Sequence, residues 1–241
     1  MTRTSFQPAI WAALLMGAAL ALHGPIAQPA DYHAFADQRG AFGIAHGGDV
    51  LSNLAFLLAA AYGAWRLRAP ALAAPARAAW RLFLCALVLT AFGSTWYHLA
   101  PDDARLVWDR LPIALACAAL LALALRSRLA LLLLAGGAIA SVCWWRATGD
   151  LRPYLLLQGA PLVLIPLLQW RAGVAARQRL AFGLAVLLYV LAKLCEVGDH
   201  ALYALLVAVS GHTLKHVLAA LAAAVLAHAF GDGPRPPLAV S

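Results

Sequence analysis

Eight apolar stretches, separated by short segments with arginine, glycine or proline, dominate this chain of 241 residues. A bilayer core about 30 Å thick needs about 20 apolar residues per helix, so eight spans occupy about 160 residues. Hydrophobic residues make up 64% of the chain and charged residues 12%, against about 45–50% and about 25% in an average soluble domain. This excludes a water-soluble enzyme, a disordered chain and a disulfide scaffold. We therefore expect an all-α, polytopic integral membrane helical bundle.

The apolar stretches define the expected membrane spans within a single membrane domain, residues 1–241. The spans are Pro8–Leu22, Asp49–Leu67, Ala79–Leu99, Arg105–Leu125, Leu129–Trp145, Leu151–Trp170, Leu180–Val197 and Gly211–Phe230. The first follows Arg3 as a signal peptide would, but no clean small-x-small cleavage site follows it, so we expect a retained helix. The Pro-rich segment 231–241 is expected to be a loose tail.

Arginines are distributed unequally between alternate loops. Eleven fall on one side and five on the other, while Lys193 and Lys215 lie within spans. Because cytoplasmic loops carry the excess of basic residues, both termini are expected in the cytoplasm. The net charge of +8 is therefore interpreted as membrane orientation, and no nucleic-acid partner is expected. The Ala/Leu/Arg-rich composition favours a bacterial cell membrane; no oligomeric state is predicted.

Ionisable side chains at membrane depth are costly, so each is a functional candidate. Ser94 and His98 end the third span, Asp109 opens the fourth, and His212 and His216 open the last. By the expected topology, all of them approach the non-cytoplasmic face. Three separate segments therefore converge on one layer of the membrane.

The spacing of these residues predicts a metal site. His212 and His216 are four residues apart and share a helical face, and His98 can supply a third imidazole from a neighbouring helix. Three histidines with an open fourth position describe a catalytic Zn²⁺ site, where bound water has a pKa of about 7. Asp109 is the carboxylate expected to take and return a proton. The Ser94 hydroxyl, one turn before His98, can donate to a developing oxyanion.

Each of these residues also has a structural explanation when taken alone. Ser94 suits helix packing, and Asp109 suits a helix start or an arginine pair. Glu196 and Asp199 are interpreted as a helix cap or solvated loop, ahead of a role in orienting a ligand histidine. Interhelical hydrogen bonds or solvated loops are expected for the remaining histidines: His23, His33, His46, His200 and His228. The combination favours a functional site.

The pattern Ser94-x3-His98, Asp109 and His212-x3-His216 resembles that of the alkaline ceramidases. Their wider superfamily includes adiponectin-receptor-like proteins and lipid-remodelling proteins of the GPI anchor. The segment Asp49–Leu54 also resembles the start of the family's first helix, and the similarity runs from about Asp31 to Phe230. The family core has seven helices. The resemblance thus implies a seven-helix hydrolase core at 49–230 and an additional N-terminal helix at 8–22.

The resemblance also implies an activity. It implies a zinc-dependent amidase that cleaves ceramide-like lipids to a sphingoid base and a fatty acid, with zinc on His98, His212 and His216. Asp109 would handle the water and Ser94 the oxyanion, and the partners would be a lipid substrate and the membrane. Some family members bind calcium before the first core helix. The segment Asp31–Asp49 has fewer carboxylates than such a site needs, so calcium is not expected.

Three other functions are compatible with parts of the pattern. A receptor-like or haemolysin-type member of the superfamily would use the same zinc ligands structurally, without amidase activity. A rhomboid-type intramembrane serine protease would use Ser94 and one late histidine, but leaves the other site residues unexplained. A metal or proton transporter would spread its polar residues along a path across the bilayer, whereas here they gather at one face.

Overall fold

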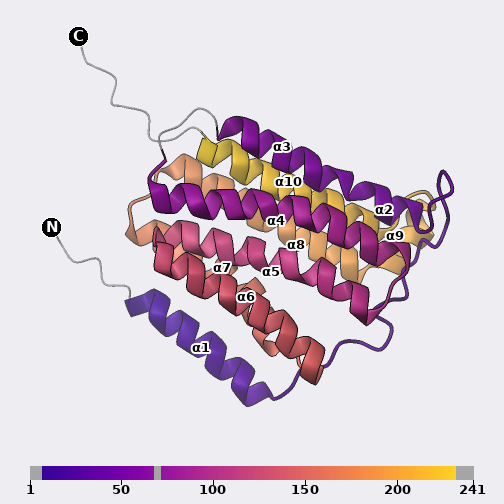
Figure 1. The fold of residues 1–241 in the computed structure, drawn as a ribbon, viewed down its shortest axis with the longest axis horizontal. Coiled ribbons are helices and arrows are strands. Elements are labelled where there is room, and N and C mark those ends of the chain that lie inside the picture. Colours follow the sequence, from indigo (N-terminus) through magenta and orange to yellow (C-terminus); the bar gives the residue numbers. More distant parts are fainter. Residues whose placement is uncertain (1–6, 68–71, 232–241) are drawn as a thin grey trace, which may run out of the picture.

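Helices account for most of the described chain in this computed structural model, which describes residues 7–67 and 72–231 (Figure 1). They are α1 (Gln7–His23), α2 (Gly47–Ser52), α3 (Leu54–Arg66), α4 (Ala74–Leu99), α5 (Asp103–Leu125), α6 (Arg128–Thr148), α7 (Arg152–Arg171), α8 (Ala176–Val197), α9 (Asp199–Leu206) and α10 (Gly211–Gly231). The described part has two isolated β-bridges and no longer strand. The expected all-α membrane bundle is confirmed.

Six of the described helices, α4 to α8 and α10, are long and apolar enough to cross a membrane. The shorter helices α2 and α3 run along α10 and α4 and complete the core of the bundle. Helix α1 is also apolar and lies outside this core, against α7 (Figure 1). Large apolar side chains such as Leu132, Trp170 and Leu180 are exposed on the outer surface, as expected for helices that face lipid.

The observed helices differ from the expected spans in the second span and in an additional short helix. The stretch expected as Asp49–Leu67 is two helices, interrupted at Asn53, whose side-chain amide donates to the Asp49 carbonyl (2.9 Å). Helix α9 was not anticipated, because it is shorter than a span. Residues 232–241 of the expected loose tail lie outside the described residues.

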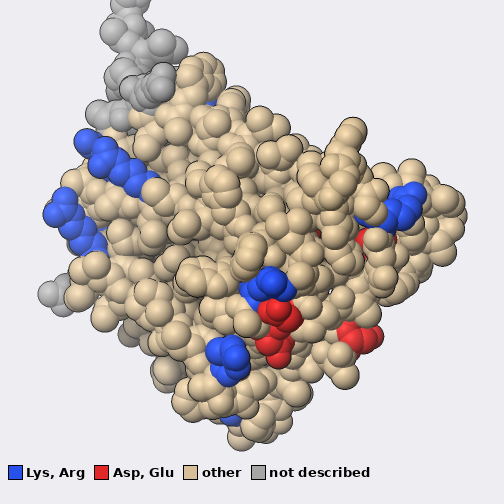
Figure 2. Space-filling model, turned by 45° about the vertical axis from the view of Figure 1, so that its right-hand side comes forward, with Lys and Arg blue, Asp and Glu red and all other residues tan. Residues whose placement is uncertain are grey.

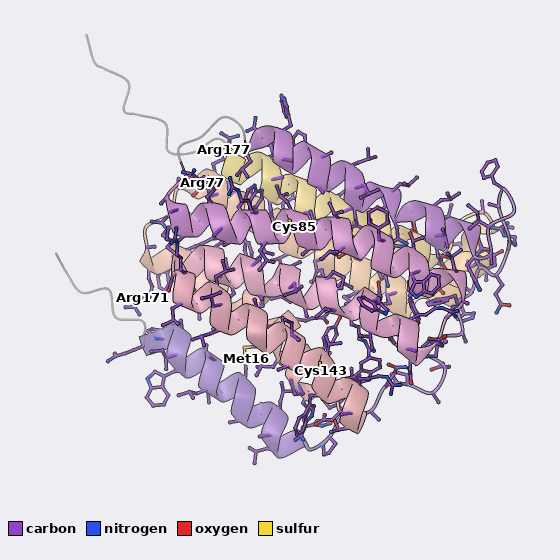
Figure 3. All side chains as sticks on the ribbon, in the orientation of Figure 1. Met16, Arg77, Cys85, Cys143, Arg171 and Arg177 are labelled. Carbon is purple, nitrogen blue, oxygen red and sulfur yellow. The ribbon has the colours of Figure 1, made fainter. Side chains whose placement is uncertain are left out.

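The two ends of the bundle differ in charge. Of the ten acidic residues, Asp232 lies outside the described segments, and all others lie at the end formed by α2, α9 and the start of α5. Arginines at the opposite end include Arg77, Arg171 and Arg177 (Figure 3). Figure 2 shows basic side chains at its left-hand end, where no acidic side chain of the described residues is in view. The two ends of the bundle's long axis therefore carry opposite types of charged residue.

Residues 24–46 form a cover over the acid-rich end. The amide of Ile26 donates to the Asp150 carboxylate (3.1 Å), and the Ala36 amide donates to Asp199 (2.9 Å). Within the cover, the Arg39 guanidinium binds Asp37 with two bonds of 2.8 Å and holds the pKa of that carboxyl below its usual range. A lowered pKa keeps Asp37 ionised in the folded state, so this anchor weakens only as the pH falls below about 4.

Candidate metal centre

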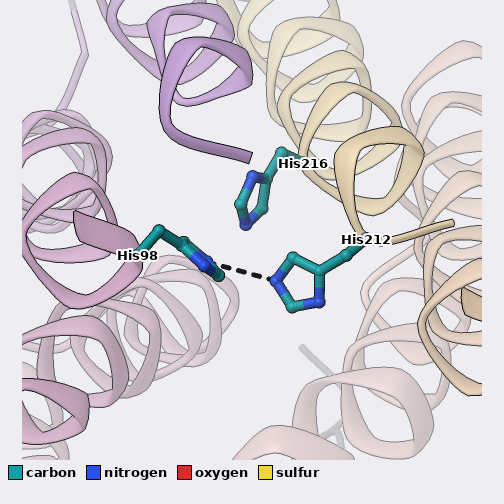
Figure 4. Close-up of side chains that lie close together, drawn as sticks. All are labelled: His98, His212 and His216. Atoms are coloured by element: carbon teal, nitrogen blue, oxygen red, sulfur yellow. Dashed lines mark hydrogen bonds between the residues drawn. The ribbon is translucent and has the colours of Figure 1, made fainter. Parts of the chain in front are cut away.

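Three buried histidines meet at the acid-rich end. His98 is the next-to-last residue of α4, and His212 and His216 lie one turn apart at the start of α10. One ring nitrogen of each lies within 4.8 Å of the other two, and the rings turn toward a common point (Figure 4). The Nε2 atoms of His98 and His212 are 3.2 Å apart. Two imidazoles on a tetrahedral ion with metal–nitrogen bonds of about 2.0–2.1 Å place their nitrogens about 3.3 Å apart.

The surrounding hydrogen bonds prepare His216 to bind a metal. The Ser52 hydroxyl donates its only hydrogen to the Asp49 carbonyl (2.9 Å). It must therefore accept from Nδ1 of His216, 2.8 Å away, which leaves the Nε2 lone pair of that ring free. A second nitrogen held in this way is the usual arrangement for a histidine ligand. With three imidazoles as donors, the site suits a divalent transition metal such as zinc.

Two buried carboxylates hold the start of α10 in place. Asp199 accepts a hydrogen bond from the backbone amide of His212 (2.8 Å), so it caps this helix, as one of its expected roles required. Asp49 accepts from the hydroxyls of Thr213 (2.7 Å) and Ser210 (3.0 Å). Gly211 allows the close approach, because a Cβ atom there would overlap the Cys195 carbonyl. These contacts fix the rotation of α10 and hence the direction of both histidines.

Phe35, which belongs to the cover, packs against two of the three histidines. Its ring centroid lies 4.7 Å from that of His98 and 4.4 Å from that of His212. Phe35 is itself buried. The cluster is therefore shielded from water on this side, which strengthens electrostatic interactions within it.

A cavity of about 270 Å³ extends from His216 into the bundle. Ser94, Asp109 and His216 all contribute to its wall. Along α4 the lining continues through Thr90 and Leu87 to Phe83, which is about 16 Å along the helix axis. Its remaining walls are mostly apolar and come mainly from α5, α7, α8 and α10, with Phe56 of α3 and Tyr32 of the segment before α2. The cavity thus joins a polar end to a long apolar chamber.

Gly93 lets α4 and α5 approach each other beside Ser94 and Asp109. A Cβ atom at Gly93 would overlap the Trp108 carbonyl and lie 3.5 Å from the Asp109 amide. Backbone atoms cannot swing aside as a flexible side chain can, so any larger residue must push the helices apart. The relative position of Ser94 and Asp109 therefore depends on this glycine.

Gly93→Ala is expected to destabilise the protein by about 1–3 kcal/mol, the usual cost of overpacking. The measurement is thermal unfolding in detergent. Gly136→Ala in α6 is the matched control, because a Cβ atom there meets nothing within 4 Å; its melting temperature should be unchanged or slightly higher. Equal melting temperatures for Gly93→Ala and the unmodified protein would contradict the close contact.

The structure brings together all five residues singled out from the sequence, with His98, His212 and His216 as one cluster and Ser94 and Asp109 on the adjoining cavity. The interpretation of Glu196 as a cap or solvated loop is wrong. Its carboxylate binds Lys193 (2.6 Å) and Lys215 (3.0 Å) at the cavity wall. The sequence did contain a signal for these ion pairs, because two lysines and one acid lie within or next to membrane spans, where a charge needs a partner.

Three of the remaining histidines make hydrogen bonds as expected, whereas the expectation is wrong for His46, whose buried Nδ1 atom has no hydrogen-bond partner among the described residues. His33 contacts the Tyr97 hydroxyl (2.8 Å), His200 the Ala34 carbonyl (2.9 Å), and His228 the Tyr62 hydroxyl (2.7 Å). The contributions of Phe35 and Ser52 were missed, because neither has a distinctive spacing from the histidines in the sequence.

Comparison with protein-family models, with curated proteins and with solved structures found no match to this chain. Its function must therefore be inferred from the residues and geometry of the site.

Proposed function

We propose that this chain is a zinc-dependent membrane amidase that hydrolyses the N-acyl bond of ceramide-like lipids to a sphingoid base and a fatty acid. The observation that supports it best is the connection between the histidine cluster and the cavity. A three-imidazole metal site adjoins a chamber that holds a carboxylate and a hydroxyl at its polar end and apolar side chains beyond. A long-chain amide needs this combination of groups.

Each polar residue has a distinct part in this proposal. His98, His212 and His216 would hold Zn²⁺, which when bound supplies Lewis acidity and acidifies water. Asp109 accepts a proton from the attacking water and delivers it to the amine that leaves. The Ser94 hydroxyl is buried on the cavity wall beside Asp109, and it can turn its hydrogen toward the carbonyl oxygen as negative charge develops there.

The apolar chamber favours a single long chain as the acyl part of the substrate. Its wall along α4 runs from Ser94 to Phe83, and burial of a methylene group contributes about 0.8 kcal/mol. The resemblance to the alkaline ceramidases supplies the choice of a ceramide-like amide. Hydrolysis adds one water across the C–N bond and requires no further co-reactant.

A receptor-like or haemolysin-type protein with structural zinc is the main alternative. It requires the three histidines but gives no role to Asp109 and Ser94 on the cavity. A rhomboid-type protease requires a serine activated by a histidine. Ser94 makes no hydrogen bond to a histidine among the described residues, which gives that mechanism no support.

The test is a lipidomic comparison of the purified protein with its His216→Ala variant, each incubated with a mixed N-acyl lipid extract. We expect fatty acid and the matching amine to accumulate only with the unmodified protein. Zinc bound at one ion per chain with no amide consumed would instead support the receptor-like alternative. The products identify both the bond that is cut and the lipid class.

The arginine-rich end is proposed to face the cytoplasm of a bacterial cell, with both termini there and the histidines near the non-cytoplasmic face. The charge difference between the two ends supports this orientation. Alkaline phosphatase, which is active only outside the cytoplasm, is expected to be active when fused after Pro101, between α4 and α5. The same enzyme fused after Ser127, between α5 and α6, should be inactive. The reverse pattern would refute the orientation.

A further inference from the structure

Arg110, next to Asp109 in α5, is a buried cation whose hydrogen-bonding capacity is unused. Only 3% of its surface is exposed, and it contributes to the wall of the cavity. Its Nε and Nη1 atoms have no hydrogen-bond partner among the described residues. A buried guanidinium normally binds acceptors with its planar fork of donors, and leaving such donors unpaired is costly. The side chain is therefore poised for a ligand.

Aromatic rings hold this guanidinium in a fixed orientation. The Arg110 Cζ atom lies 3.9 Å from the centroid of the Trp145 ring, 5.0 Å from that of Tyr32 and 5.4 Å from that of Tyr154. Ring faces attract the cation but accept none of its in-plane N–H groups in the way an oxygen does. The donors are thus oriented in advance, which lowers the entropic cost of binding an anion.

The polar end of the cavity carries more positive than negative groups. Lys193 and Lys215 share the single carboxylate of Glu196, and Arg110 forms no ion pair within the described chain. With Asp109 counted as a carboxylate, the cavity wall holds three cations and two anions. An excess buried cation is unfavourable unless it is paired. One further negative charge would balance this end of the cavity.

We infer that the cavity takes acidic N-acyl lipids, with Arg110 binding a carboxylate or phosphate on the amine part of the molecule. This inference rests on the proposed amidase function and narrows its substrate class. A carboxylate or phosphate presents the paired oxygens that a guanidinium binds in bidentate fashion. The acyl chain occupies the apolar chamber, while the acidic group pairs with Arg110 on a wall that also carries Lys215.

Binding can be measured separately from turnover by native mass spectrometry of the purified protein, because an intact amide and its products differ in mass. The probes are N-dodecanoylglycine, N-dodecanoylethanolamine, the phosphate ester of that ethanolamide, and dodecanoate. The first two differ only in a carboxylate against a hydroxymethyl group. We expect at least one acidic amide to bind about tenfold or more tighter than the ethanolamide. The acidic amide with the larger affinity relative to the ethanolamide shows whether the site prefers a carboxylate or a phosphate.

Arg110→Gln is expected to reduce the ratio of the affinities for the acidic amide and the ethanolamide to near one. The affinity for the ethanolamide itself should stay within about threefold of that of the unmodified protein. Arg105→Gln is the matched control, because Arg105 lies in the same helix but pairs with Asp102 (3.0 Å) outside the cavity wall; its ratio should be unchanged. Lys215→Gln, which removes a second cation from the cavity, should also lower the ratio. It provides the test if Arg110→Gln does not fold.

Equal binding of the ethanolamide and both acidic amides by the unmodified protein would overturn the inference. So would a preference that survives Arg110→Gln. Dodecanoate binding tighter than every amide would assign Arg110 to the fatty-acid product and also overturn it. If the acidic amides bind selectively but remain uncleaved, the inference about the ligand stands and the proposed amidase function fails.

Discussion

Replacing His212 with alanine is expected to abolish both bound zinc and amide hydrolysis. Its Nε2 atom faces His98 at 3.2 Å, so the substitution removes one of three donors and leaves two, too few for the site. Loss of one oxyanion donor costs an enzyme about 10²–10³-fold in rate. Loss of the metal should cost more. Zinc content by elemental analysis should fall from one ion per chain to near zero, and turnover should fall to background.

His228→Ala is the matched control for this substitution. His228 lies in the same helix but at the opposite end, where it contacts the Tyr62 hydroxyl (2.7 Å). That variant should keep its zinc and its rate. Hydrolysis that persists in a zinc-free His212→Ala protein would refute the metal mechanism, whatever the metal content of the control.

Asp109→Asn is expected to keep the zinc and lose most of the turnover. The substitution preserves the size of a side chain on the cavity wall but removes its ability to accept a proton. Positioned acid–base groups contribute about 10²–10⁴-fold, so a rate loss in this range is expected. Because Asp109 is not one of the three clustered metal donors, zinc content should stay at one ion per chain. The measurement pairs elemental analysis with single-turnover kinetics.

Asp103→Asn gives the corresponding control for Asp109. Asp103 is the first residue of the same helix, and its carboxylate accepts from Gln28 (3.0 Å) and contacts His33 (3.1 Å) at the surface. It should retain nearly the full rate. A near-normal rate for Asp109→Asn, or a loss of zinc equal to that of His212→Ala, would remove the assigned role of Asp109.

Hydropathy located the membrane helices well but not their polar ends. Helix α8 begins at Ala176, four residues before the apolar stretch, because Arg177 and Arg179 continue the helix outside the hydrocarbon layer. Helix α6 continues past Trp145 to Thr148 and stops at Gly149, whose positive φ of 74° suits a helix end. Hydropathy reports the part of a helix that meets lipid, whereas backbone hydrogen bonds set its full length.

The sequence predicted those site residues that form a local pattern or lie at membrane depth. It did not predict residues that come together only when distant segments fold against each other. The pair His212 and His216 is a local pattern on one helix, and cost at membrane depth singled out His98 and Asp109. Phe35 carries no such mark, and Arg110, although it follows Asp109 in the expected span, was counted among the arginines that set the membrane orientation. Phe35 comes from the cover segment, and the role of Arg110 depends on aromatic rings from other parts of the chain. Such contacts follow from packing.

The cover has a kinetic consequence for how the metal exchanges with its surroundings. Phe35 packs on two of the ligands, and Asp199 binds both the Ala36 amide of the cover and the His212 amide of α10. Lifting the segment would therefore loosen a ligand helix at the same time, which makes such openings rare. An ion once bound would have a long residence time, set by the frequency of opening. Chelators should strip it over hours rather than seconds.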